Sequence, residues 1–170
     1  MTTSNYIAIH KEADITPDGL YRYALRRSWD PAVWPLAFIM LNPSTADTEI
    51  DDPTIRRCMG FARRLGYGGI TVYNLYAYRA TKPADLWKVE DPVGPGNDHW
   101  LNACLYSRYM ADLPVVAAWG ANARPDRVDA VMRMRGAENL CCFGVTKAGA
   151  PRHPLYLPGD AELVPWAGAR

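Results

Sequence analysis

After residue 36, short apolar runs alternate with segments of helical periodicity, and this alternation restricts the fold more than any other feature of the sequence. The run LAFIML (36–41) has no polar face, as expected of a strand that is covered on both sides. Further strands are predicted at 69–78, 113–120 and 139–146, and helices at 53–65, 81–89, 98–111 and 124–136. This order predicts a three-layer α/β/α sandwich around a four-stranded, mostly parallel sheet.

Residues at the ends of these segments support the assignment. Asp52 is suited to cap the helix at 53–65, with Pro53 at its first position and Gly66 after its end. Thr81 is the expected cap of the helix at 81–89.

The N-terminal part of the chain reads as β-structure. NYIAIH (5–10) and LYRYALRR (20–27) both alternate, and TPDG between them is typical of a turn. We therefore expect a β-hairpin extension over 1–35, within a single α/β domain that covers residues 1–170.

Composition and charge exclude several classes of protein. The net charge is +1, which rules out a polycation but leaves room for a local basic groove. No apolar run reaches the ~20 residues that span a bilayer, and the N-terminus lacks the pattern of a signal peptide. We therefore expect a cytoplasmic protein with no membrane contact. The four cysteines form no C-x-x-C pair, the three histidines are scattered, and neither a P-loop nor G-x-G-x-x-G is present, so neither a metal site nor a cofactor is predicted.

Polar or aromatic residues follow each predicted strand of the parallel sheet. In open sheets of this kind, ligands bind beyond the carboxyl ends of the strands. The candidate binding residues there are Asn42, Pro43, Ser44, Thr45, Asp47, Asn74, Tyr76, Trp119, Thr146, Lys147, Arg152 and His153. Together they predict a pocket of amides, hydroxyls, flat aromatic walls and one histidine. Such a pocket suits a planar, hydrogen-bonding ligand such as a nucleobase.

Each of these residues also has a purely structural interpretation. Asn42-Pro43 is a common turn sequence. Asn74 lies inside an apolar strand and needs hydrogen-bond partners, which either the protein or a ligand provides. Trp119 fits a core as well as a stacking platform. The arginines at 56, 57, 63 and 64 form either a solvated helix face or a phosphate track. A hydrolase triad of Ser44, His153 and Asp47 is disfavoured, because no G-x-S-x-G motif is present.

Five runs of the sequence resemble the family named domain of unknown function 1643. These runs are LNPSTAD, DPTIRRC, NLYAYRAT, AWG and TKAGAPRHPLYL, and they extend over most of the chain. The name of that family implies no activity.

The order of four motifs is more distantly similar to the uracil-DNA glycosylase superfamily. MLNP (40–43) resembles its Gly-x-Asn-Pro element, and VYNLYAYRA (72–80) resembles its base-reading strand. VVAAWGANA (115–123) and RHPLYL (152–157) are similar to its Trp-Gly strand and its His-Pro loop. Met40 stands in place of a glycine, Ser44 departs from the usual residue, and the last motif is shortened.

This second resemblance implies roles for individual residues. Asn42 and His153 would be catalytic, with Asn42 holding a water and His153 assisting the leaving base. Asn74 would read the base edge, Tyr76 would stack on the base, and Arg152 and Lys147 would hold phosphate. Three functions stay open: hydrolysis of the N-glycosidic bond of a base flipped out of DNA, binding of a base or nucleotide without cleavage, or a reaction on a small nucleotide or nucleoside.

Overall fold

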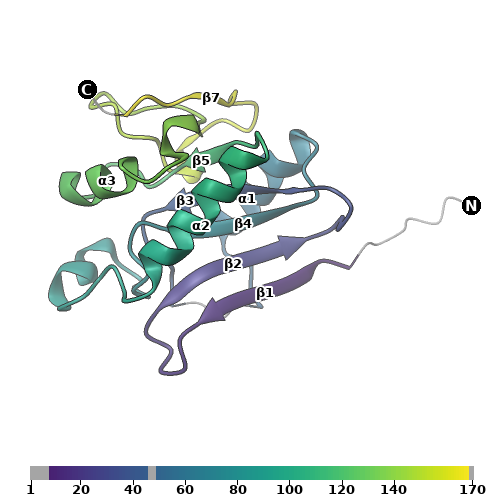
Figure 1. Cartoon of the computed structure of the whole chain (residues 1–170). Helices are drawn as coiled ribbons and strands as arrows, with labels where there is room; N and C mark the ends of the chain where they lie inside the picture. The colour runs from purple at the N-terminus through teal and green to yellow at the C-terminus, as the bar shows by residue number, and fades with distance from the viewer. Residues whose placement is uncertain (1–7, 46–48, 169–170) are drawn as a thin grey trace, which may run out of the picture.

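The computed structural model of the chain describes residues 8–45 and 49–168 (Figure 1). A seven-stranded sheet runs through it in the order β1-β2-β4-β3-β5-β6-β7. The strands are β1 (His10–Ile15), β2 (Arg22–Ser28), β3 (Pro35–Met40), β4 (Gly69–Asn74), β5 (Val115–Ala117), β6 (Leu140–Cys142) and β7 (Val164–Pro165). The helices are α1 (Pro53–Arg64), α2 (Asn97–Met110) and α3 (Pro125–Met132), with short 3₁₀ turns η1 (Pro83–Lys88), η2 (Ala137–Asn139) and η3 (Pro154–Tyr156).

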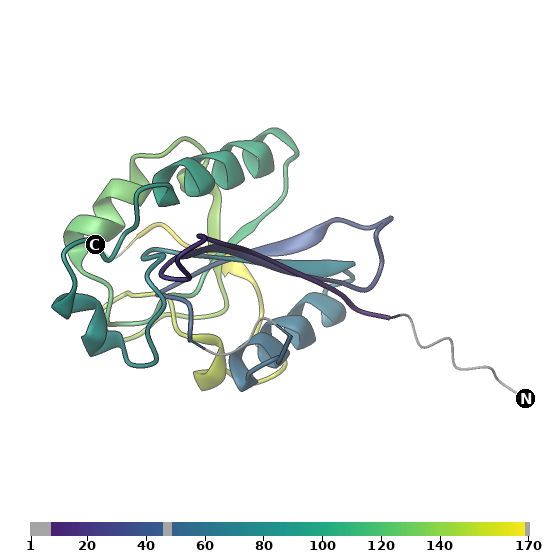
Figure 2. The ribbon, with the colours of Figure 1, turned by 90° about the horizontal axis from the view of Figure 1, so that it is seen from below.

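Helices cover both faces of this sheet, as the expected three layers require. Seen along the sheet in Figure 2, α2 and α3 lie on one side, and α1 and η3 lie on the other. Strand β3 and the residue after it alternate between two apolar clusters. Leu36, Phe38 and Met40 pack on the side of α1, and Ala37, Ile39 and Leu41 pack on the side of α2 and α3. A strand buried on both faces explains why LAFIML has no polar position.

The count of four strands is wrong, although the predicted mixed α/β class is confirmed. Strands β4, β3, β5 and β6 pair in parallel and form the centre. The hairpin of β1 and β2 is not a separate extension, because β2 pairs antiparallel with β4. At the other edge, β7 pairs antiparallel with β6. The pairings of β2 with β4 and of β7 with β6 join residues far apart along the chain, so local periodicity does not predict them.

The hairpin also starts later than its apolar content predicts. The first strand was expected at 5–10, whereas β1 begins at His10. It pairs with β2 from His10–Ser28 to Asp14–Ala24, and the register shifts before Ile15–Arg22. Residues 1–7 lie outside the described part of the chain. The expected turn is present, and Gly19 occupies it with a φ of +75° that side chains disfavour.

The start of α1 follows the sequence closely. Asp52 accepts a hydrogen bond from the backbone N–H of Ile55 at 2.8 Å, and Pro53 takes the first helical position. The predicted helix at 81–89 is instead the 3₁₀ turn η1, which begins at Pro83 after Lys82 without a side-chain cap. Thr81 binds the hydroxyl of Thr45 at 2.8 Å. None of the helices in the described residues combines the length and apolar character needed to cross a membrane.

Candidate functional site

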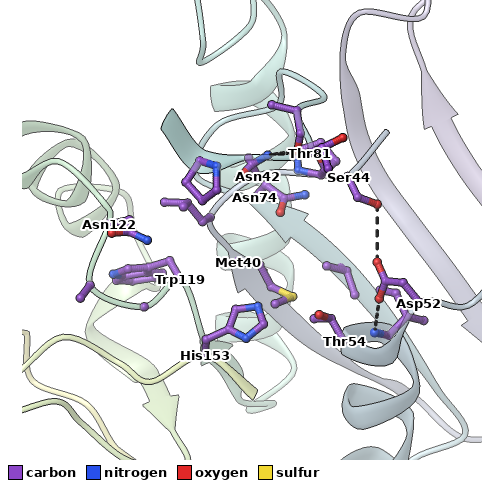
Figure 3. A pocket seen from close by; sticks show the side chains of 18 of the residues that line it. Met40, Asn42, Ser44, Asp52, Thr54, Asn74, Thr81, Trp119, Asn122 and His153 are labelled. Carbon is purple, nitrogen blue, oxygen red and sulfur yellow. Dashed lines mark hydrogen bonds between the residues drawn. The ribbon is translucent and has the colours of Figure 1, made fainter. Parts of the chain in front are cut away.

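A cavity of about 500 Å³ lies at the carboxyl ends of β3, β4 and β5, beside the first turn of α1 (Figure 3). Its apolar lining comes from Met40, Ile55, Val72 and Trp119 among others. Its polar lining consists of the side chains of Arg22, Asn42, Ser44, Asp52, Thr54, Asn74, Thr81, Asn122, Thr146, Arg152, His153 and Tyr156. The volume falls within the range of about 300–1,000 Å³ that is usual for small-molecule sites.

The side-chain amide of Asn42 has a defined orientation at the end of β3. Its Nδ2 donates to the backbone carbonyls of Pro43 at 3.0 Å and Ala80 at 2.9 Å. Both partners are acceptors, so the bonded end must be nitrogen, and Oδ1 is the end left over. Asn42 can therefore accept a hydrogen bond from water or a ligand in the cavity.

Asn74, the last residue of β4, presents an unbonded amide to the cavity. The residue is 3% exposed, and it pairs with Met40 across the parallel strands. Among residues 8–45 and 49–168, no group hydrogen-bonds its side chain, although its backbone carbonyl accepts from Asn97 Nδ2 at 3.0 Å. The amide atoms of Asn74 are not fully enclosed, because the side chain opens into the cavity. There it presents two N–H donors and one acceptor oxygen.

His153 contributes a neutral hydrogen-bond donor from the loop after β6. Its Nδ1 accepts the backbone N–H of Leu155 at 3.3 Å, so in the neutral ring the proton lies on Nε2. Burial lowers the pKa of His153 below its ordinary value, and the carboxylate of Asp52 opposes this shift. In Figure 3, Met40 lies between His153 and the two amides of Asn42 and Asn74.

Charged groups reach the cavity from two sides. Asp52 caps α1 with Oδ1 and accepts from Ser44 Oγ with Oδ2 at 3.5 Å. Arg22, the first residue of β2, is 5% exposed, and its Nε is fully buried with no hydrogen bond in the described residues. Burial, followed by the neighbouring Arg79, lowers the pKa of Arg22 to about 10. The side chain remains a cation at neutral pH.

The structure brings most of the candidate residues together. Eight of the sequence-predicted positions line the cavity: Asn42, Pro43, Ser44, Asn74, Trp119, Thr146, Arg152 and His153. Trp119 serves also as core, since its ring packs edge-to-face on Trp166 at 5.0 Å between centroids. Asp47 lies outside the described residues. Ser44 donates to Asp52 rather than to His153, which does not match a hydrolase triad.

Three predicted positions lie outside the cavity lining: Thr45, Tyr76 and Lys147. Tyr76 is 2% exposed, packs edge-to-face on Trp87, and accepts the backbone N–H of Arg124 with its hydroxyl. Strand β4 ends at Asn74, and both Leu75 and Tyr76 join the cluster on the side of α2 and α3. Tyr76 therefore packs in this cluster and does not line the cavity.

The arginines of α1 also lie outside the cavity lining. Arg56, Arg57 and Arg64 donate to backbone carbonyls of Asp51, Leu157 and Ala161, and Arg63 lies over the ring of Trp29. These contacts use the side chains within the protein, which disfavours the phosphate track.

Several lining residues were not predicted from the sequence: Arg22, Thr54, Thr81, Asn122 and Tyr156. Asn122 follows the Trp-Gly end of a predicted strand, so its position alone makes it a candidate. Arg22 sits in an alternating strand, and an arginine there is ordinarily solvent-facing. Its place in the cavity follows from the pairing of β2 with β4.

The fold and this cavity define a mixed α/β protein with a polar, ligand-sized site at the carboxyl edge of its parallel strands. The family model described as "Protein of unknown function (DUF1643)" matches residues 22–155. The chain belongs to this family, as its motifs predicted. The matched range includes every residue that lines the cavity except Tyr156. A search of curated proteins gives no match.

Proposed function

We propose that the cavity binds a nucleobase and that the amide of Asn74 reads the base edge. The observation that carries this proposal is the buried side chain of Asn74, which lines the cavity and has no hydrogen-bond partner among the described residues. An amide offers a donor and an acceptor about as far apart as the paired groups on a base edge, which is why Asn binds bases in two-bond contacts.

The rest of the lining supports the same ligand class. Apolar side chains on one side of the cavity would contact the flat faces of a base, while Asn42 Oδ1 and His153 Nε2–H offer an acceptor and a donor on its periphery. A purely apolar ligand would leave these polar groups without partners. A planar ring with several polar edge atoms satisfies them.

Binding of the base is tested by isothermal titration with a panel of nucleosides. We expect Asn74→Ala to weaken the best ligand by roughly 10- to 100-fold, the range for losing a paired amide contact. The control is Asn102→Ala, which removes an exposed amide of α2 that bonds only the carbonyl of Asp98 in the described residues. An equal loss in both variants, or none in Asn74→Ala, would refute the proposed role.

A second candidate function is hydrolysis of the N-glycosidic bond, in line with the resemblance to uracil-DNA glycosylases. Asn42 favours it, since its amide nitrogen is held by two carbonyls and its oxygen is free to position a water. The water oxygen would bond to C1′ of the sugar as the bond from C1′ to the base nitrogen breaks. The electron pair would stay on the base, where His153 Nε2–H would stabilise it, and the proton of the water would finally neutralise it.

A base-release assay separates this reaction from binding alone. The substrates are duplex and single-stranded oligonucleotides with uracil, hydroxymethyluracil, hypoxanthine or a guanine–thymine mismatch, together with free nucleosides and nucleotides. Hydrolysis predicts release that falls strongly in both Asn42→Ala and His153→Gln, with Asn102→Ala unchanged. Binding that depends on Asn74 without any release would identify a non-catalytic base-binding module.

A further inference from the structure

Four arginines of the described chain are buried, and one of them differs from the other three. Arg27 donates to Asp51 at 2.6 Å, Arg127 to Asp98 at 2.7 Å, and Arg108 to the carbonyl of Pro35 at 2.9 Å. Arg22 is buried to the same degree. Among the described residues, no hydrogen bond or ion pair engages its guanidinium, and its Nε has no access to solvent.

The position of Arg22 makes this difference informative. Its side chain lines the cavity rather than the closed core. An unpaired cation is costly to bury, by several kcal/mol, because it loses its hydration without gaining a counter-charge. Proteins usually tolerate such groups at sites where a ligand supplies the missing charge. The donors of an arginine are arranged as a fork that matches the oxygens of carboxylate and phosphate.

The charges around Arg22 favour an anion. Asp52 is the only acidic residue among the described residues that line the cavity, while Arg152 adds a second cation there. Each oxygen of Asp52 already accepts one hydrogen bond, Oδ1 from the N–H of Ile55 and Oδ2 from Ser44. Arg79 repels Arg22, and Asp52 attracts it only from beyond hydrogen-bond and ion-pair distance. The lining therefore holds two arginines against one carboxylate, and no carboxylate of the described residues contacts Arg22 directly.

We propose that Arg22 is an anion-binding residue of this cavity and that it binds the phosphate of a nucleotide whose base lies against Asn74. The anion site stands on Arg22 alone, whereas its assignment to a nucleotide phosphate rests on the proposed function. A cavity of about 500 Å³ has room for more than a base. The phosphate belongs either to a free mononucleotide or to a nucleotide flipped out of a DNA strand.

The test compares nucleosides with their 5′-monophosphates by isothermal titration, in the full chain and three variants. We expect the wild type to bind the monophosphate at least about tenfold more tightly, as a charge-assisted contact of this kind provides. Arg22→Gln should abolish that preference and leave nucleoside affinity unchanged, and Arg22→Lys should restore part of it. Arg108→Gln, which removes an equally buried arginine outside the cavity lining, should keep it. A preference that is absent in the wild type, or that survives in Arg22→Gln, would overturn the proposal.

Inorganic phosphate separates failure of this proposal from failure of the base site. The wild type and Arg22→Gln are melted with and without inorganic phosphate. If no nucleoside binds, but phosphate raises the melting temperature of the wild type and not of Arg22→Gln, the anion site is supported and the base site is refuted. If a nucleoside and its 5′-monophosphate bind with equal affinity, the anion site alone is refuted. Absence of both effects refutes both. Tighter, Arg22-dependent binding of a single-stranded oligonucleotide than of the monophosphate identifies a DNA strand as the source, and the reverse identifies a free nucleotide.

Thermal stability gives an independent readout. A buried cation without a direct ion pair or hydrogen bond contributes little stability, so Arg22→Met should melt at or above the temperature of the wild type. A clear drop in melting temperature would show that the protein itself pairs this charge, and the proposal would fail.

Discussion

The polar side chains on the two sides of the end of β4 differ in their hydrogen bonding. On the side of α2, the fully buried Asn97 donates through Nδ2 to the carbonyls of both Asn74 and Leu75 at 3.0 Å. Arg127 adds a bond to Leu75 at 2.8 Å and an ion pair to Asp98. On the side of α1, the side chain of Asn74 is almost as deeply buried and bonds to none of the described residues.

This difference separates polar groups that bond the backbone from polar groups that face the cavity, where we propose that a ligand binds. Asn97 and Arg127 bond the backbone where β4 ends, although Asn97 Oδ1 and Arg127 Nη2 are themselves buried without a partner in the described residues. Neither residue lines the cavity. Asn74 and Arg22 line it and contribute nothing comparable to the backbone. Substitution on the first side should therefore reduce stability, and substitution on the second should reduce binding.

The largest stability effect is expected for Asn97→Ala. The change removes two buried hydrogen bonds and leaves the carbonyl of Asn74 without its side-chain donor, so the free energy of unfolding should fall by about 2–3 kcal/mol. Urea denaturation measures it. Asn102→Ala, at an exposed amide of the same helix, should change it by less than about 0.5 kcal/mol. Equal changes in the free energy of unfolding in the two variants would contradict the structural role of Asn97.

Asp52 belongs to both groups, since it caps α1 and lines the cavity. Asp52→Ala should lower the free energy of unfolding by about 1 kcal/mol through loss of the cap. Asp52→Asn keeps a good cap and should be close to neutral. It also removes the negative charge, so it should tighten binding of a nucleoside monophosphate. Loss of stability in both variants alike would mean that the charge of Asp52, rather than its capping oxygen, stabilises α1.

A smaller stability effect is expected for Asn74→Ala. Its side chain has no hydrogen bond to lose among the described residues, so the free energy of unfolding should change by less than about 1 kcal/mol, with either sign. The same urea titration as for Asn97→Ala provides the comparison. A loss as large as that of Asn97→Ala would contradict the distinction between the two sides of β4.

The smallest effect concerns His153 and pH. Its folded pKa lies below the ordinary 6.5, because burial disfavours the imidazolium. Above that pH the ring is neutral in both folded and unfolded chains. As pH falls, the unfolded chain takes up the proton first, so folded stability declines until the folded pKa is reached. The melting temperature should therefore fall more between about pH 7 and pH 5 in the wild type than in His153→Gln.

The control for this pH effect is His99→Gln, at an exposed position of α2. It should retain the slope of the wild type. A wild-type slope in His153→Gln would assign the pH dependence to other groups.

Much of the architecture was predictable from local patterns. The burial of β3 on both faces, the Asp52-Pro53 start of α1 and the polar residues after the parallel strands all appear where the apolar pattern and capping rules place them. Thr81 shows where such rules stop working. It has the chemistry of a helix cap, but Pro83 starts a 3₁₀ turn two residues later and Thr81 binds Thr45 across the loop instead.

The sequence by itself determined the four parallel strands and the three α-helices of the described chain, because those preferences depend on residues only a few positions apart. It also determined that polar groups follow the parallel strands. Only the tertiary structure decided that the hairpin joins the sheet and carries Arg22 into the cavity and that Tyr76 turns away from it. It also decided that the amide nitrogen of Asn97 bonds the backbone, whereas the side chain of Asn74 faces the cavity without a bond to the described residues. Strand pairing and hydrogen-bond satisfaction depend on residues far apart along the chain. For that reason, only the folded chain distinguishes a structural amide from one that is available to a ligand.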